Sequence, residues 1–313
     1  MDGMGGWPAE GDSGDWPVPD SGPPTLLIHH MQVRGSENSY HLAPDERAPV
    51  ELQYSHPPFA TQLGAQGLRL FDFDTAYNSA AAAVEVYAHD LGDEGTRCHF
   101  IGFCLLEMAA WSDANPHHAP VFVLIESNVA QDLQNGLQYL QRDIRSTLGR
   151  ERLYIPLDLQ GRHASVRDAV LADGLAADRH AARCFIFVLH DRDRARAEAP
   201  PARMTLVADP ERLLFMLADT PEDEWAAFFS FDVIDDEATV SSLIAQGFLV
   251  RTIVDDPIQP GAGDRARGAS AEQPIPEVEP APGSALGGWP VACNPVTAPA
   301  GCEPWMIEPE DGP

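Results

Sequence analysis

The stretch GLRLFDFD (residues 67–74) decides the fold. It is an almost continuous apolar run that ends in two carboxylates, Asp72 and Asp74, two positions apart. Short apolar runs of this kind are typical of strands that are buried on both faces of a parallel sheet. Because residues two apart on a strand face the same side, we expect both carboxylates to project together from one end of this strand.

Similar runs recur along the chain and alternate with helical patterns. The strand candidates are residues 25–33, 68–74, 84–89, 121–126, 183–190, 213–219, 228–232 and 248–255. Helical patterns cover residues 100–113, 130–148, 165–176 and 235–246, and Gly247 is expected to cap the last of these helices. Alternation of strands and helices predicts an α/β fold with a parallel sheet. Eight such strands predict a closed (β/α)8 TIM-type barrel.

The two ends of the chain differ in composition from the part between them. Residues 1–24 are rich in Gly, Pro, Asp and Trp, which predicts a disordered or loosely docked acidic tail. Residues 25–255 hold the predicted barrel domain. Residues 256–313 form a Pro/Gly-rich C-terminal extension that closes with a Cys293/Cys302 loop.

The chain is strongly acidic, with 48 acidic and 20 basic residues and a net charge of −28. It contains no lysine, which excludes a Schiff-base lysine and a P-loop lysine. An acidic surface repels nucleic acid and anionic lipid headgroups, so we expect a small-molecule substrate, no nucleic-acid partner and no membrane association. The simpler interpretation is a solubilising surface, and the charge leaves the oligomeric state open.

The cysteines give conflicting indications of compartment. Two close pairs, Cys98/Cys104 and Cys293/Cys302, are typical of small disulfide loops and favour a secreted or periplasmic protein. No signal peptide is visible at the N-terminus, so either it was removed or the protein stays inside, and a cytoplasmic protein is the alternative. Cys184 lies in an apolar run and is expected to be a buried thiol.

Polar residues follow the ends of most strand candidates, where a barrel of this type carries its chemistry. Asp72, Asp74, Glu126 and the amide of Asn38 would form an oxygen-only site, which suits Ca2+ or Mg2+. A cation would relieve the repulsion between the three carboxylates. The alternative is a set of separate, solvated carboxylates. Asp191, Asp219 and Asp232 also lie at the ends of strand candidates and are candidates for the same site. For these three, the alternative is a helix N-cap or a solvated loop residue.

Several motifs resemble one family in order and spacing. They are GSENSYHLAP (35–44), YSHPP (54–58), GLRLFDFD (67–74), TRCHFIGFC (96–104), AWSDANPHHAPVFVLIE (110–126), GFLVRT (247–252) and ACNPVTAPAGC (292–302). Together they resemble the bacterial calcium-dependent phosphoinositide-specific phospholipase C family. The resemblance implies a PLC-like phosphodiesterase fold of the barrel type. It also implies phosphodiester cleavage by the inositol 2-hydroxyl, with two histidines as base and acid and Ca2+ on the phosphate.

The resemblance assigns roles position by position. The implied metal ligands are Asn38, Asp72, Asp74 and Glu126, with Asp72 one methylene shorter than the family's glutamate. The strand-end His89 matches the second catalytic histidine, whereas Glu37 stands where the first would be. The candidate substrate-binding residues are Arg251, His190 and Asn128.

Basic groups of the family pattern are missing. Asn128 replaces a lysine, and Ser230 and Phe231 replace a basic pair. Since catalysis of phosphoryl transfer is mostly positioning and electrostatic stabilisation, these changes weaken the case for ordinary phosphoinositide cleavage.

Three interpretations follow. The first is a metal-dependent enzyme of altered acid–base chemistry, in which Glu37 and His89 carry out proton abstraction, elimination, cyclisation or isomerisation on a non-phosphoinositide substrate, as a lyase or cyclase would. The second is a calcium-dependent phosphodiesterase with Glu37 as the base. The third is a non-catalytic metal- or ligand-binding homologue.

Overall fold

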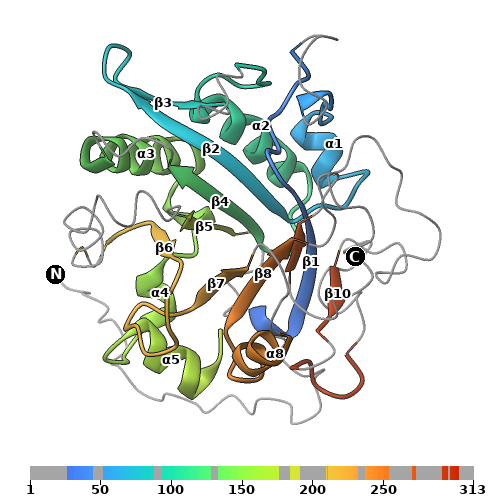
Figure 1. The fold of residues 1–313 in the computed structure, drawn as a ribbon, viewed down its shortest axis with the longest axis vertical. Coiled ribbons are helices and arrows are strands. Elements are labelled where there is room, and N and C mark those ends of the chain that lie inside the picture. The colour runs from blue at the N-terminus through green and yellow to red at the C-terminus, as the bar shows by residue number, and fades with distance from the viewer. Residues whose placement is uncertain are drawn as a thin grey trace, which may run out of the picture.

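The strands form one sheet, which is flanked by helices (Figure 1). This computed structural model describes residues 27–44, 52–87, 94–127, 133–175, 184–190, 209, 211–231, 237–253, 270–272, 291–294 and 297–302. All four helical patterns are confirmed as helices α2, α3, α5 and α8. None of the helices in these ranges is long and apolar enough to cross a membrane.

The elements have the following bounds. The strands are β1 (Met31–Ser36), β2 (Leu70–Asn78), β3 (Ala83–Val86), β4 (Val121–Ser127), β5 (Phe185–His190), β6 (Leu214–Met216), β7 (Phe228–Phe231), β8 (Leu249–Ile253), β9 (Ser270–Glu272) and β10 (Val291–Cys293). The α-helices are α1 (Phe59–Leu63), α2 (Ile101–Ala114), α3 (Leu133–Leu148), α4 (Pro156–Gln160), α5 (Val166–Asp173) and α8 (Glu237–Ala245). Two 3-10 helices, η1 (Ile28–His30) and η5 (Arg150–Arg152), complete the set.

Eight strands form a parallel ring. Their order is β6-β5-β4-β2-β1-β9-β8-β7, and every neighbouring pair along this path is parallel. The two ends of the path meet at a parallel bridge between Leu217 and Phe228, beside which the Ala218 N–H donates to the Phe228 carbonyl at 2.9 Å. The predicted α/β fold of the (β/α)8 TIM-barrel type is confirmed.

One predicted barrel strand is wrong. Residues 84–89 were expected to form a parallel strand, but β3 pairs antiparallel with β2, and Thr75 lies opposite Val86. Only residues 79–82 separate the two strands, whereas a parallel crossover needs about a dozen residues. The missing place in the ring is taken by β9, which pairs with Arg34 and Gly35 of β1 on one side and with β8 on the other.

The two faces of the ring strands have different neighbours. Phe71 and Phe73 of β2 belong to a core cluster that also holds Phe59 of α1 and Met108 of α2. The alternate positions face the interior of the ring, where a small apolar cavity is lined by residues such as Leu70, Phe122, Leu124, Val188, Leu217 and Leu249. Continuing those inward positions along β2 and β4 leads to Asp72, Asp74 and Glu126, so the apolar interior ends in carboxylates.

The C-terminal region packs against the start of the barrel. Strand β10 pairs antiparallel with β1, and the Asn294 N–H donates to the His30 carbonyl at 2.7 Å. Both predicted disulfides, Cys98–Cys104 and Cys293–Cys302, are present, and Cys184 is a buried thiol. Gly247, with a φ of 92°, follows α8 as expected of a C-cap. The division into a tail, a barrel domain and an extension stays a prediction.

Candidate active site

Three titratable residues lie abreast at the carboxyl ends of neighbouring strands. Asp74 of β2 pairs in register with Glu126 of β4, which pairs in turn with His190 of β5. Paired residues of parallel strands project to the same side, so these three side chains share the interior face, and Asp72 joins them two residues earlier on β2. The register of the sheet therefore gathers the predicted carboxylates.

The closest group consists of Asp72, Glu126 and His190. One ligand atom from each lies within 4.8 Å of the others, and His190 Nδ1 lies 2.7 Å from Glu126 Oε1. The carboxylate side chains are almost fully buried, and the His190 side chain is 15% exposed. Buried carboxylates need partners or a cation to offset their desolvation, so this group fits a metal site.

The loop after β1 places Asn38 beside this group. Asn38 adopts a left-handed backbone conformation, with a φ of 47°, which asparagine tolerates better than most residues. The Ser39 N–H donates to the Asp72 carbonyl at 3.0 Å, and Ser39 Oγ accepts from the Asp72 N–H at 2.9 Å. This pair of bonds fixes the loop to β2 at the level of the carboxylates.

Tyr40 connects two predicted metal ligands. Its hydroxyl lies 2.9 Å from Asp74 Oδ2 and 3.1 Å from Asn38 Oδ1, and shares its one hydrogen between these oxygens. Burial, the charge of Asp74 and the bond to it raise the pKa of Tyr40 well above its ordinary value. Tyr40 therefore remains a neutral donor that holds the two ligands together.

Tyr54, from the loop before α1, also contacts Asn38. Asn38 Nδ2 donates to the Tyr54 hydroxyl at 3.3 Å. Burial raises the pKa of Tyr54, and the charges of Glu37, Asp74 and Asp72 add to the increase. The charges of Glu37 and of the two β2 carboxylates thus act on the pKa of Tyr54 in the same direction, and the place of the Glu37 carboxylate among the cation donors stays a prediction.

Two histidines and an arginine form hydrogen bonds to the backbone of the segments that carry Glu37 and Tyr54. His56 Nε2 donates to the Glu37 carbonyl at 2.9 Å, and Arg97 Nε donates to the His56 carbonyl at 2.6 Å. Burial lowers the pKa of His56 to about 4, so His56 is neutral near pH 7. His41 Nδ1 donates to the Tyr54 carbonyl at 2.8 Å, which fixes the chain that carries the Tyr54 ring.

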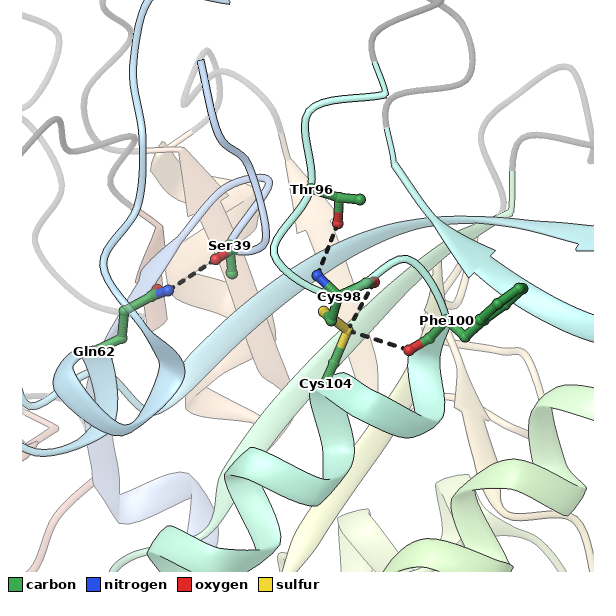
Figure 2. Close-up of a disulfide and its surroundings, with 6 residues drawn as sticks. All are labelled: Ser39, Gln62, Thr96, Cys98, Phe100 and Cys104. Carbon is green, nitrogen blue, oxygen red and sulfur yellow. Dashed lines mark hydrogen bonds between the residues drawn. A yellow bond between two sulfur atoms is a disulfide. The ribbon is translucent and has the colours of Figure 1, made fainter. Parts of the chain in front are cut away.

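The Cys98–Cys104 disulfide follows Arg97 directly in the chain (Figure 2). It joins the segment before α2 to the first turn of that helix. Figure 2 also shows Gln62 of α1, whose Nε2 donates to the Ser39 carbonyl at 2.8 Å. The Asn38 loop is thus held by β2 and by α1.

Arg251 lies below the carboxylates, inside the ring. Its Nη2 is 3.7 Å from Asp72 Oδ2, and its Nη1 donates to Ser230 Oγ at 3.0 Å. Ser230 is in register with Arg251 on the neighbouring strand β7. The Arg251 side chain is only 5% exposed, so its charge serves first to balance Asp72.

The structure brings together most of the predicted site residues. Asn38, Asp72, Asp74 and Glu126 meet at one mouth of the barrel, with His190 and Arg251 in direct contact with members of the set. Their roles stay predictions, as does the role of Glu37. His89 and Asn128 lie outside the described residues.

Sequence reasoning gave no role to Tyr40, Tyr54 or His56. All three lie within the motifs GSENSYHLAP and YSHPP, so the signal was present in the stretches that carry the resemblance. What was missing was the pairing between a loop after β1 and a loop before α1, which only the three-dimensional contacts supply.

The donor set fits calcium. Carboxylate oxygens from Asp72, Asp74 and Glu126 and the amide oxygen of Asn38 are the hard ligands that Ca2+ prefers. Their strand-end positions and the linking Tyr40 hydroxyl place these donors around one mouth.

Fold and site together define a (β/α)8-type barrel with an oxygen-rich cation site at the carboxyl ends of its strands. Residues 84–272, more than half of the chain, match the family described as phosphoinositide phospholipase C, Ca2+-dependent. The chain belongs to this family of calcium-dependent, PLC-like phosphodiesterases. The matched region ends with the last residue of β9, in agreement with the place of that strand in the ring.

Solved structures agree with the fold. A Ca2+-dependent phosphatidylinositol-specific phospholipase C from Streptomyces antibioticus is 20% identical, with a TM-score of 0.57 over 79% of this chain and 94% of that one. A calcium-dependent phosphoinositol-specific phospholipase C from a Pseudomonas species is 11% identical, with a TM-score of 0.62 over 87% and 97%. No curated protein matches the chain. The expected compartment and the expected absence of membrane association stay predictions.

Proposed function

We propose that the chain is a calcium-dependent phosphodiesterase in which the Glu37 carboxylate takes the place of a histidine as the proton acceptor. The observation that supports this role is the position of Glu37 directly before the predicted metal ligand Asn38, in a loop that His56 Nε2 holds through the Glu37 carbonyl at 2.9 Å. A carboxylate within a cation site is a suitable base, because a nearby positive charge keeps it ionised.

The steps require two proton-transfer groups. Glu37 accepts the proton of the attacking hydroxyl as its oxygen bonds to phosphorus, and His89 donates a proton to the alcohol oxygen whose bond to phosphorus breaks. The described chain runs to Tyr87, whose N–H donates to the Asp74 carbonyl at 3.2 Å. When bound, Ca2+ supplies positive charge that offsets the negative charge on the phosphate.

The electrostatics limit the substrate. The chain has no lysine, and Arg251 is buried against Asp72 and Ser230. A carboxylate about 4 Å from a phosphate anion costs about 4 kcal/mol at an effective dielectric of 20. We therefore propose a phosphodiester whose alcohol group bears no additional phosphate, such as phosphatidylinositol or a soluble inositol phosphodiester.

A second candidate is the altered acid–base chemistry on a substrate without a phosphodiester. It is favoured by Ser230, which takes the place of a basic residue of the family pattern and accepts a hydrogen bond from Arg251. This arrangement leaves an acidic mouth that suits a neutral substrate better than an anionic one. A non-catalytic metal-binding protein is the third candidate.

The test is release of inositol phosphate from phosphatidylinositol, presented in neutral vesicles and as a soluble short-chain form, with Ca2+ or with a chelator. Glu37→Gln should lower turnover by about 10²–10⁴-fold, the usual loss when a general base is removed. Its Ca2+ affinity, measured by calorimetry, should change little. Glu151→Gln, an exposed change in η5, is the matched control.

The outcomes separate the candidates. Calcium-dependent release that is lost in Glu37→Gln and retained in Glu151→Gln supports the phosphodiesterase. Ca2+ binding without release from either form of the lipid contradicts it and leaves the other two candidates. Release that is unchanged in Glu37→Gln contradicts the role given to this carboxylate.

A further inference from the structure

We infer that the cation site also takes a divalent transition-metal ion of borderline softness, such as Zn2+, with the imidazole of His190 as a nitrogen ligand. This inference deepens the proposed function, because it concerns the cation of the same site. It rests on the composition and geometry of one group, Asp72, Glu126 and His190.

The geometry of the three side chains permits a shared ion. Their ligand atoms lie within 4.8 Å of one another, and His190 Nδ1 is already 2.7 Å from Glu126 Oε1. Donors that each lie about 2.0–2.2 Å from one ion are at most about 4.4 Å apart. Small rotations of the three side chains are therefore enough to bring all three donor atoms to one ion. In the sheet, Glu126 and His190 are register partners, which fixes the distance between their backbones.

The chemistry of the donor atoms determines which ions bind more tightly. Ca2+ and Mg2+ are bound through oxygen, whereas imidazole suits Zn2+ and related transition-metal ions. The imidazole in this set therefore adds little for Ca2+ but much for a borderline ion, whereas the two carboxylates serve both kinds of ion. The remaining oxygens of the site, on Asp74 and Asn38, belong to the Tyr40 hydrogen-bond group. They provide the harder, oxygen-only part of the same mouth.

Burial makes the nitrogen ligand effective. The Glu126 and Asp72 side chains are 6% and 2% exposed, and that of His190 is 15% exposed. Water competes weakly for an ion at such a position, and the Arg251 guanidinium, 3.7 Å from Asp72, balances one of the carboxylate charges. With the neighbouring Asp74 carboxylate included, the three carboxylates and the guanidinium carry a net charge of −2, which one divalent ion neutralises.

Affinity alone does not separate a ligand from a residue that merely orients Glu126, since loss of a ligand's hydrogen-bond partner also weakens metal binding by about 10–100-fold. The experiment therefore uses two readouts on the full chain after removal of metals. Calorimetry gives the affinities for Zn2+, Mn2+ and Ca2+. Pulsed electron paramagnetic resonance of bound Mn2+ reports directly on a coordinated nitrogen.

The variants are His190→Gln and, as the control, His163→Gln. His163 also pairs with a carboxylate, Asp173 at 2.8 Å, but on the surface and away from the other site residues. We expect His190→Gln to lower Zn2+ affinity at least tenfold, to change Ca2+ affinity less than threefold and to abolish the nitrogen coupling of Mn2+. His163→Gln should leave all three unchanged.

The inference is overturned if wild-type Mn2+ shows no nitrogen coupling, or if His190→Gln weakens Zn2+ and Ca2+ equally. Failure of the proposed function has a different signature. In that case the metals bind as described, with the nitrogen coupling present, but no inositol phosphate is released. Glu126→Gln, which removes a shared ligand, should weaken all three ions and thereby show that they occupy one site.

Discussion

The Tyr40 hydroxyl donates to Asp74 Oδ2 at 2.9 Å and also lies 3.1 Å from Asn38 Oδ1. One buried hydrogen thus holds together two side chains that come from different strand ends. In a metal site such a partner orients the ligands before the ion arrives.

Tyr40→Phe removes this hydrogen and keeps the ring. We expect Ca2+ affinity to fall by about 10–100-fold, because Asp74 and Asn38 lose the group that orients them. Calorimetric titration with Ca2+ measures the change. Tyr139→Phe, on a half-buried ring that stacks on Tyr77, is the control and should leave the affinity unchanged. Equal affinities in wild type and Tyr40→Phe would contradict the orienting role.

Asp72→Asn removes the charge that faces Arg251. Breaking a buried ion pair leaves the other charge uncompensated, so we expect the free energy of unfolding to fall by about 3 kcal/mol in the absence of metal. Urea denaturation measures the loss. Asp143→Asn breaks an exposed pair with Arg142 and should cost less than about 1 kcal/mol. If the two variants lose the same small amount, Arg251 does not depend on Asp72.

His29 predicts a pH dependence of stability far from the active site. It is 8% exposed, its Nδ1 accepts from the Leu175 N–H at 3.1 Å, and burial lowers its pKa from 6.5 to about 4. A histidine with a lowered folded pKa binds its proton first in the unfolded chain. Stability should therefore be full above pH 6.5 and fall as the pH drops towards 4, by about 3 kcal/mol in total.

The variant His29→Asn tests this dependence. Its amide oxygen replaces the Nδ1 acceptor but does not titrate. Urea unfolding between pH 7 and pH 4 should therefore show a smaller loss of stability than in wild type. His163→Asn is the matched control and should retain the wild-type slope. A slope that is unchanged in His29→Asn would assign the pH dependence to other groups.

The Cys98–Cys104 disulfide should contribute to stability. Closing so short a loop restricts the unfolded chain by about 2 kcal/mol in the chain-entropy description. The double variant Cys98→Ser/Cys104→Ser should lose about this amount by urea denaturation. A reductant should lower the stability of the variant less than that of wild type, because only Cys293–Cys302 remains to be reduced. An unaffected variant would show that the bond is structurally neutral.

The alternation of apolar runs and helical patterns predicted the barrel and the gathering of carboxylates at one mouth. Asp72, Asp74 and Glu126 follow buried runs on strands that are adjacent in the sheet, so the periodicity of the strands was sufficient to bring them together. The prediction for residues 84–89 was wrong because an apolar composition does not indicate whether a strand pairs parallel or antiparallel with its neighbour. The connection after β2 is too short for a parallel crossover, and this shortness indicates the antiparallel pairing.

The supporting contacts could not be predicted from composition. The place of β9 depends on a three-residue strand within a Pro/Gly-rich segment, which no periodicity marks. The pairing of Arg251 with Asp72 and Ser230 depends on which side chains share the interior of a closed ring. Such contacts follow from the closure of the sheet and not from the local sequence.

The position of β9 between β1 and β8 has a consequence for synthesis of the chain. Gly35 pairs with Glu272, so β1, the first strand among the described residues, keeps an open backbone edge until residues 270–272 have been made. Long-range closure of this kind is slow, and an open edge is a template for pairing with other chains. A chain that stops at residue 255 would lack the closing segment, and we expect it to aggregate during translation rather than to form a smaller folded barrel.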